Sequence, residues 1–125
     1  MLIFGHPLVE SEKFFRVETV LDIKNSPNGS VVLIDSFRGN EDIIKFCQEN
    51  LVPYTLRVSS LKEAIFANAL NAKYIIAPKK LLKEIIRVAE HYLFDTKVLA
   101  KIDREDDIEE MAKVGVDGVI LAYES

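Results

Sequence analysis

The chain has 125 residues, of which 49% are hydrophobic and 29% are charged, and its formal net charge at pH 7 is -4. This length and balance are typical of one globular domain that buries a core without metals or disulfides. The negative charge argues against nucleic acid or an anionic membrane as the main partner. A single cysteine, Cys47, forms no disulfide within the chain and favours a reducing cytoplasm. The apolar start is interrupted at Gly5, so we expect no signal peptide, and no stretch has the length of a membrane span.

Strand and helix patterns alternate along the chain. In order, they predict strand 14–18, helix 19–25, strand 31–35, helix 40–49, strand 54–58, helix 60–70, strand 74–77, helix 78–94, strand 98–102, helix 104–114 and strand 118–122. Strands 31–35 and 74–77 are almost entirely apolar, as parallel strands covered on both faces are. Thr19 with Asp22, Ser60 with Glu63, and Asp103 are the predicted N-terminal caps.

Three helix ends look alike in sequence. Asn50, Asn71 and Gly115 each follow an amphipathic stretch, and a run of strand-forming residues begins shortly afterwards. Asn and Gly tolerate the left-handed backbone conformation that commonly ends a helix. The pattern therefore predicts a left-handed residue at each of these three positions, and a chain built from successive βα units.

Two of these units form a longer repeat. Residues 53–77 align without a gap onto residues 97–121 at a constant offset of 44, which matches Arg57 with Lys101 and Asn71 with Gly115. Strands separated by about 20 residues, with a helix in nearly every gap, require right-handed crossovers and a mainly parallel sheet. We predict one three-layer α/β domain over residues 1–125.

Two arrangements of this sheet fit the length. One is an open, flavodoxin-like sheet with helices on both faces, and the other is a half-barrel that pairs with a second copy. A complete eight-stranded barrel needs about 250 residues, so a monomeric barrel of that kind is excluded. The all-apolar strands favour the open sheet.

The last unit carries a resemblance to a known architecture. Its residues are Val98-Leu99-Ala100-Lys101-Ile102-Asp103, followed by a helix that Gly115 ends and by the strand Gly118-Val119-Ile120-Leu121. This segment resembles the closing βαβ unit of glycerophosphodiester phosphodiesterases and of several phosphate-binding (β/α)8 barrels. The resemblance covers about a fifth of the chain and is mostly structural: Gly115 ends a helix, Gly118 lets a strand start tightly, and the apolar residues belong to the core.

The functional motifs of those families are not found. The phosphodiesterases have His-Arg-Gly after the first strand, where this chain has Gly5-His6-Pro7, and Glu105-Asp106-Asp107 lies in the first turn of a helix instead of forming a metal pair at a strand end. Asp103-Arg104 stands in place of the Gly-rich phosphate loop of the other barrels. Receiver domains share the size, but they have a Lys after the last strand, where this chain has Ala122-Tyr123-Glu124. As a whole, the chain is most similar to small uncharacterised bacterial α/β proteins, which imply no activity.

Ligands of parallel sheets bind beyond the carboxyl ends of the strands. The polar and loop residues expected at that edge are Asp35, Ser36, Arg38, Arg57, Ser59, Ser60, Pro78, Lys79, Lys101, Asp103, Arg104 and Tyr123. Arg57 and Lys101 occupy equivalent positions in the repeat, and a cation inside a parallel sheet must reach water, a carboxylate or an anion. One interpretation is pairing with Asp35 or Asp103, or extension of the cation to solvent.

The other interpretation is an anion-binding site. Its members would be Arg57, Ser59, Ser60, Lys101 and Asp103, with N–H groups at the helix start after Ser60 as further donors. No spacing of metal ligands, paired carboxylates or a nucleophile with its base is found, so we expect no metal and no cofactor. The candidate residues His6, His91 and Cys47 are interpreted as a turn residue, part of a solvated helix face and a buried apolar residue, respectively.

The helix at residues 61–70 suggests a protein partner. Leu61, Ile65 and Ala69 form its predicted inward stripe, and Phe66 and Leu70 widen the apolar arc beyond what one sheet contact needs. We therefore expect a homodimer that uses Phe66 and Leu70. Two functions remain open: a non-catalytic cytoplasmic binding or regulatory module, and a small enzyme or binder that acts on a phosphorylated or carboxylated metabolite.

Overall fold

The computed structural model describes residues 1–121. Within them lie seven strands, which are β1 (Leu2–Phe4), β2 (Lys13–Arg16), β3 (Ser30–Ile34), β4 (Tyr54–Arg57), β5 (Tyr74–Ile76), β6 (Lys97–Ile102) and β7 (Gly118–Leu121). The α-helices are α1 (Val20–Lys24), α2 (Glu41–Glu49), α3 (Leu61–Ala69), α4 (Leu82–His91) and α5 (Ile108–Val114), with short 3-10 helices η1 (Lys79–Leu81) and η2 (Glu105–Asp107). No helix of these residues combines the length and apolarity needed to cross a bilayer.

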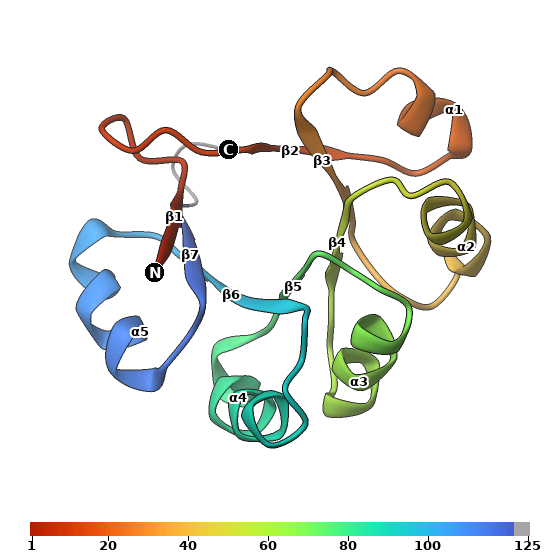
Figure 1. The fold of residues 1–125 in the computed structure, drawn as a ribbon. Coiled ribbons are helices and arrows are strands. Elements are labelled where there is room, and N and C mark those ends of the chain that lie inside the picture. Colours follow the sequence, from red (N-terminus) through yellow and green to blue (C-terminus); the bar gives the residue numbers. More distant parts are fainter. Residues whose placement is uncertain (122–125) are drawn as a thin grey trace.

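The strands form one sheet in the order β1-β7-β6-β5-β4-β3-β2, and every pair is parallel. From β2 to β7 each strand lies next to its successor in sequence, so the crossovers all step in the same direction. Right-handed crossovers of this kind put every helix on the same face of the sheet. Figure 1 shows the result, a curled half-barrel with the helices outside. The predicted three-layer α/β class with a parallel sheet of repeated βα units is confirmed in its half-barrel form.

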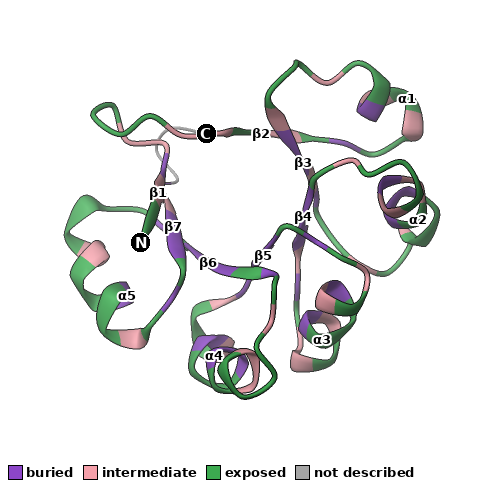
Figure 2. Cartoon of the chain, viewed as in Figure 1, coloured by how far each residue is buried: buried purple, intermediate pink, exposed green. Residues whose placement is uncertain are grey.

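Two layers of apolar side chains enclose the strands. The outer core lies between the strands and the helices and includes Leu56, Ile75 and Val119. The inner core faces the axis of the half-barrel and is made of strand residues, namely Phe4, Val31, Tyr74, Ile76 and Leu99, with Phe14, Leu33 and Ile120 partly buried against them. Figure 2 shows buried residues along β3 to β7.

The all-apolar strands are thus covered on both faces, as expected, but not by helices on both faces. The inner face is covered by strands from the other side of the curl. The rings of Phe4, Phe14 and Tyr74 pack against one another with centroids 5.1 to 6.0 Å apart, and they come from β1, β2 and β5. The prediction of helices on both faces of the sheet is therefore wrong. An apolar strand pattern indicates that both faces of the strand are buried, but it does not show whether helices or other strands cover them.

Strand β1 was not among the predicted elements. It pairs with β7, with Leu2 opposite Gly118 and Phe4 opposite Ile120, so the first strand lies beside the last one (Figure 1). Gly118 is required for this pairing, since a Cβ atom there would lie 2.8 Å from the Cβ of Leu2 and 2.9 Å from the Leu2 carbonyl oxygen. Three residues are too few to show a periodic pattern, which explains why the sequence does not reveal the strand.

Glu12, just before β2, links opposite sides of the curl. Its carboxylate pairs with Lys73, with Nζ and Oε2 2.7 Å apart, and accepts a hydrogen bond from the Tyr74 hydroxyl at the start of β5. Burial raises the pKa of Glu12, but the hydrogen bonds from Lys73 and Tyr74 and the Lys73 charge outweigh it, so the pKa lies below its usual value. The ionised form of Glu12 therefore stabilises the curl of the sheet.

Four helices end in the same motif. In each, a residue with positive φ follows the helix, and the N–H of the residue after it donates to the carbonyl five residues earlier, which is the Schellman arrangement. The left-handed residues are Leu51, Asn71, Leu93 and Gly115, with φ of 54°, 64°, 54° and 99°. The closing hydrogen bonds run from Val52 to Cys47, Ala72 to Ala67, Phe94 to Ala89 and Val116 to Met111, with N···O distances of 2.9 to 3.4 Å.

The prediction of left-handed residues is correct for Asn71 and Gly115 and wrong for Asn50. Asn50 has φ of -103° and still donates its N–H to the Phe46 carbonyl, so the left-handed position falls on Leu51. The fourth motif, at Leu93, was not predicted because leucine rarely adopts this conformation. The predicted helix 78–94 is also too long, since α4 ends at His91.

The predicted caps have mixed outcomes. Thr19 and Asp22 form the expected reciprocal box at the start of α1, and the Ser60 hydroxyl accepts a hydrogen bond from the Glu63 N–H. Asp103 is not a cap, because the 3-10 turn η2 begins only at Glu105. Strand 118–122 is confirmed as far as Leu121, and Ala122 lies outside the described residues.

Candidate functional site

Charged side chains are placed at the carboxyl ends of β2, β3, β4 and β6. Ala100 and Ile102 belong to the outer core, so Lys101 between them points to the opposite face of β6. Arg57 likewise follows Leu56, whose side chain lies in the outer core. Alternation along a strand therefore puts Arg57 and Lys101, the two equivalent positions of the repeat, on the axis side of the sheet at its carboxyl edge.

A cavity of about 430 Å³ opens at this edge. We call it the rim cavity, and its lining residues are Asp35, Ser36, Arg57, Val58, Ser59, Glu63, Ile76, Ala77, Pro78, Lys79, Lys80 and Lys101. Three of the predicted anion-site residues, Arg57, Ser59 and Lys101, line it together. Its walls carry four cationic side chains and two carboxylates. The arrangement leaves a local excess of positive charge in an acidic protein.

Arg57 pairs with the Asp35 carboxylate, but at long range. Its Nε atom lies 3.6 Å from Asp35 Oδ1, which is beyond hydrogen-bond distance, while Arg16 Nε lies 3.0 Å from Asp35 Oδ2. The Arg57 Nε atom is buried and has no hydrogen-bond partner among the described residues. A buried donor without a partner costs free energy, so this N–H group can gain from an added acceptor.

The lysines of the rim cavity differ in their partners. Lys79 Nζ lies 2.9 Å from Glu110 Oε1, and this hydrogen bond, together with the Glu110 charge, raises the pKa of Lys79. Lys101 is exposed and has no ion-pair partner within 4.0 Å in residues 1–121. Its positive charge is therefore available to an anion that enters the cavity.

Ser59 and Ser60 hold the loop between β4 and α3. The N–H and hydroxyl of Ser59 both donate to Glu63 Oε1, at 2.9 and 3.1 Å, and the Ser60 hydroxyl accepts from the Glu63 N–H at 3.2 Å. Ser60 does not line the rim cavity. The Glu63 carboxylate already occupies donors at this helix start, so Ser60 orders the loop and is not placed to contact a ligand there.

Asp103 lies in a second, smaller cavity of about 130 Å³ next to the rim cavity. The two cavities share Ala77, Lys79 and Lys101. Four lining residues of one correspond to four of the other at the offset of 44, namely Arg57 to Lys101, Val58 to Ile102, Ser59 to Asp103 and Glu63 to Asp107. The internal repeat thus produces two adjacent hollows, and the predicted members Arg57 and Asp103 lie in different ones.

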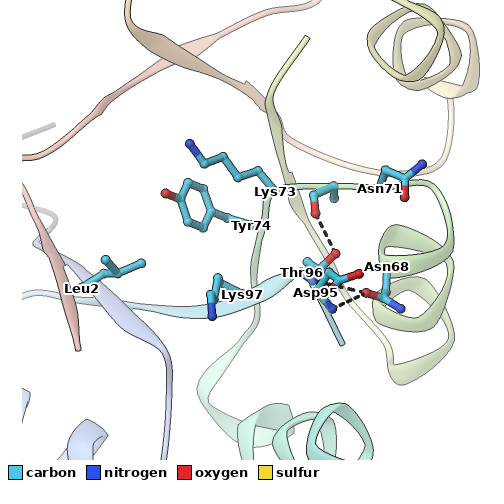
Figure 3. Close-up of a pocket in the computed structure, with 9 residues that line it drawn as sticks. Leu2, Asn68, Asn71, Lys73, Tyr74, Asp95, Thr96 and Lys97 are labelled. Carbon is cyan, nitrogen blue, oxygen red and sulfur yellow. Dashed lines mark hydrogen bonds between the residues drawn. The ribbon is translucent and has the colours of Figure 1, made fainter. Parts of the chain in front are cut away.

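A cavity of about 560 Å³ lies at the opposite, N-terminal ends of β5 and β6 and is drawn in Figure 3. Several of its polar side chains are used for internal contacts. Asn68 Oδ1 accepts hydrogen bonds from the N–H groups of Asp95 and Thr96, and the Thr96 hydroxyl donates to the Ala72 carbonyl (Figure 3). Sequence reasoning did not identify Asn68, because its partners lie 27 and 28 residues away. We interpret this end as the stabilising face of the fold.

Residues that could act as nucleophile, base or metal ligand are used elsewhere. Cys47 is fully buried, which raises the pKa of its thiol to about 11. His6 accepts a hydrogen bond from the Leu8 N–H at Nδ1 and places Nε2 3.3 Å from Glu105 Oε1. In the part of the chain that the structure describes, no three His, Cys, Asp or Glu side chains cluster as metal ligands. Tyr123 lies outside the described residues.

The helix predicted to form an interface has a different inward face from the one expected. Ala64 and Ala67 are the buried residues of α3, whereas Ile65 is 45% exposed and Phe66 is 47% exposed. The ring of Phe66 packs against Phe37, with centroids 5.7 Å apart. Leu70 is half-buried against the outer core. Leu61 packs against the outer core as predicted, but the predicted inward positions of Ile65 and Ala69 are wrong, because both are exposed and the small side chains of Ala64 and Ala67 let α3 approach the sheet on their side.

Comparisons with protein-family models and with curated proteins give no match to this chain.

Proposed function

We propose that the protein is a non-catalytic cytoplasmic module that binds a small phosphorylated or carboxylated metabolite in the rim cavity. The observation that carries the proposal is the charge of this cavity. Four cations, Arg57, Lys79, Lys80 and Lys101, line the cavity with two carboxylates. Lys79 pairs with Glu110 outside the lining, whereas Lys101 has no ion-pair partner in residues 1–121.

The size and lining of the cavity support a metabolite. A volume of about 430 Å³ lies in the range of small-molecule sites. Val58, Ile76, Ala77 and Pro78 provide apolar contacts for the uncharged part of a ligand, and the cations provide its orientation. The carboxyl edge of a parallel sheet is also where such folds bind ligands.

A thermal-shift titration with phosphate tests the proposal. A ligand that binds only the folded state stabilises it by about 1.4 kcal/mol at ten times its dissociation constant, which raises the melting temperature. We expect a saturable rise with potassium phosphate, measured against potassium chloride at equal ionic strength because screening weakens charge interactions.

Three variants make this test specific. Arg57→Ala and Lys101→Ala should each remove most of the shift and leave the fold intact. Lys97→Ala is the matched control, because Lys97 is an exposed lysine at the other end of the same strand and its loss changes the net charge equally. The proposal is wrong if the wild type shows no shift with phosphate or with a small carboxylate such as citrate. It is also wrong if Lys97→Ala and Lys101→Ala lose the same amount.

We also propose that the protein forms a homodimer through α3. Phe66 and Ile65 are adjacent, large apolar residues that are almost half exposed, and the half-buried Leu70 is the C-cap residue of the same helix. Light scattering should give the mass of a dimer at micromolar concentration, and Phe66→Glu should give a folded monomer. Leu21→Glu is the control, since Leu21 is an exposed leucine on α1. A monomeric wild type would exclude the dimer.

A further inference from the structure

The contacts around Asp35 suggest how the rim cavity is controlled. Asp35 follows β3, and the register that pairs Ile34 with Leu56 places it beside Arg57 of β4. On its other side, the register that pairs Leu33 with Arg16 brings Arg16 of β2 next to it. One carboxylate therefore lies between two arginines from the neighbouring strands.

The two arginines do not share the carboxylate equally. Arg16 Nε lies 3.0 Å from Asp35 Oδ2, whereas Arg57 Nε lies 3.6 Å from Asp35 Oδ1. An arginine and a carboxylate commonly pair through two parallel N–H···O bonds of about 2.7 to 2.9 Å, and the Asp35–Arg57 distance falls short of this geometry. The buried Arg57 Nε consequently has no hydrogen-bond partner among the described residues.

We propose that Asp35 is a built-in competitor for the anion site and that Arg16 is the positioning residue that holds Asp35 away from Arg57. This inference rests on the proposed function, since it concerns the same cavity. Asp35 and Arg57 line the rim cavity, whereas Arg16 does not. Arg16 therefore acts on an incoming anion through Asp35 and not by direct contact.

The chemistry is an exchange of ion pairs. With Arg16 in place, the Asp35 carboxylate stays on Arg16, and Arg57 Nε can donate to an oxygen of the ligand. Without Arg16, the only arginine within reach of Asp35 in the described pairs is Arg57, and the carboxylate can close the remaining gap to form the bidentate pair. An anion must then displace Asp35 before it can bind, which lowers its affinity.

A double-mutant cycle with phosphate as the ligand tests this coupling, with affinities measured by calorimetry at constant ionic strength. Exposed ion pairs are worth at most about 1 kcal/mol, so each change should reach at most about 5-fold in the dissociation constant. Asp35→Asn should tighten phosphate binding by this factor, because it removes the competing charge. Arg16→Ala should weaken binding by a similar factor.

The decisive comparison is Arg16→Ala in the Asp35→Asn background. If Arg16 acts through Asp35, removing Arg16 in the Asp35→Asn background changes the dissociation constant for phosphate by less than 1.5-fold, about the limit of measurement. The direct interaction between Arg16 and the bound phosphate is then small because solvent and salt screen it. If Arg16 acts only through its own charge, the weakening is the same in both backgrounds. Arg16→Lys keeps the positive charge but loses the planar guanidinium group. This variant shows how much of the effect on phosphate binding needs the guanidinium geometry.

A second measurement does not depend on the ligand. The Nε–H signal of Arg57 in proton–nitrogen NMR should shift in Arg16→Ala without phosphate, because Asp35 then bonds to it. The inference is overturned if Asp35→Asn binds phosphate no more tightly than the wild type, or if Arg16→Ala weakens binding equally in both backgrounds. If neither the wild type nor Asp35→Asn binds phosphate, the proposed anion site itself is wrong, so the two failures are distinct.

Discussion

Replacing the left-handed leucines at the ends of α2 and α4 should stabilise the protein. Leu51 and Leu93 both have φ of 54°, a conformation in which the Cβ atom of an L-residue crowds the following carbonyl. Their side chains are 89% and 83% exposed, so glycine there would sacrifice almost no buried apolar surface. We therefore expect Leu51→Gly and Leu93→Gly to raise the free energy of unfolding.

The magnitude follows from two opposing terms. The left-handed conformation costs an L-residue roughly 1–2 kcal/mol, and glycine removes this cost. Glycine also makes the unfolded chain more flexible, and this effect offsets about 0.4–1 kcal/mol of that stabilisation. Each substitution should then add about 0.5–1 kcal/mol, or about 2–4 °C in melting temperature for a domain of this size. The two sites terminate different helices, so the effects should be nearly additive.

Calorimetry or urea denaturation of the two variants and of their double variant measures the effect. Gly115→Ala is the reverse control, because it introduces a Cβ atom at an equivalent helix end. That atom would meet only Ile86 Cγ2 at 3.7 Å, an ordinary contact, so the expected loss of about 1 kcal/mol is conformational. The reasoning is refuted if Leu51→Gly destabilises the protein or if Gly115→Ala leaves its stability unchanged.

Three further predictions concern the sheet. Gly118→Ala should lower the free energy of unfolding by about 1–3 kcal/mol, measured in urea, because the new Cβ would lie 2.8 Å from that of Leu2; an unchanged midpoint would show that β1 does not dock so closely. Thr55→Val should raise it by about 1 kcal/mol, since Thr55 is fully buried and its hydroxyl has no partner among the described residues; a loss of stability would indicate a water bound to this hydroxyl. Glu12→Gln should lower the melting temperature at pH 7, and this difference should vanish at acid pH. The folded-state pKa of Glu12 is depressed, so its contribution is present above the unfolded pKa of about 4.3 and is lost as the pH falls through the folded value. A difference that persists at pH 3 would contradict that assignment.

Local sequence signals predicted the repeated units well. The match of Arg57 with Lys101 placed both cations on the same edge and the same face of the sheet, and the pairing of Arg57 with Asp35 was one of the two expected outcomes. These inferences depend on alternation along a strand and on the parallel direction of the strands, which the residue pattern specifies directly.

Other features depend on contacts between distant segments and are not specified by any local pattern. The choice between an open sheet and a half-barrel depends on the direction in which the crossovers step, and both choices bury the apolar strands equally. The role of Asn68 depends on a loop 27 residues away. The loose pairing of Asp35 with Arg57 depends on Arg16, which lies on a strand that the alignment of the repeat does not cover.

The position of β1 has a consequence for how the chain folds. Strands β2 to β7 each pair with the next strand in sequence, so these contacts close short loops, whereas β1 joins residues 2–4 to residues 118–120. Loops of short span cost less entropy to close and form faster. Residues 2–4 must therefore wait for the synthesis of residues 118–120 before they can pair. Phe4 packs against the rings of Phe14 and Tyr74, so the inner core is completed only when β1 joins β7.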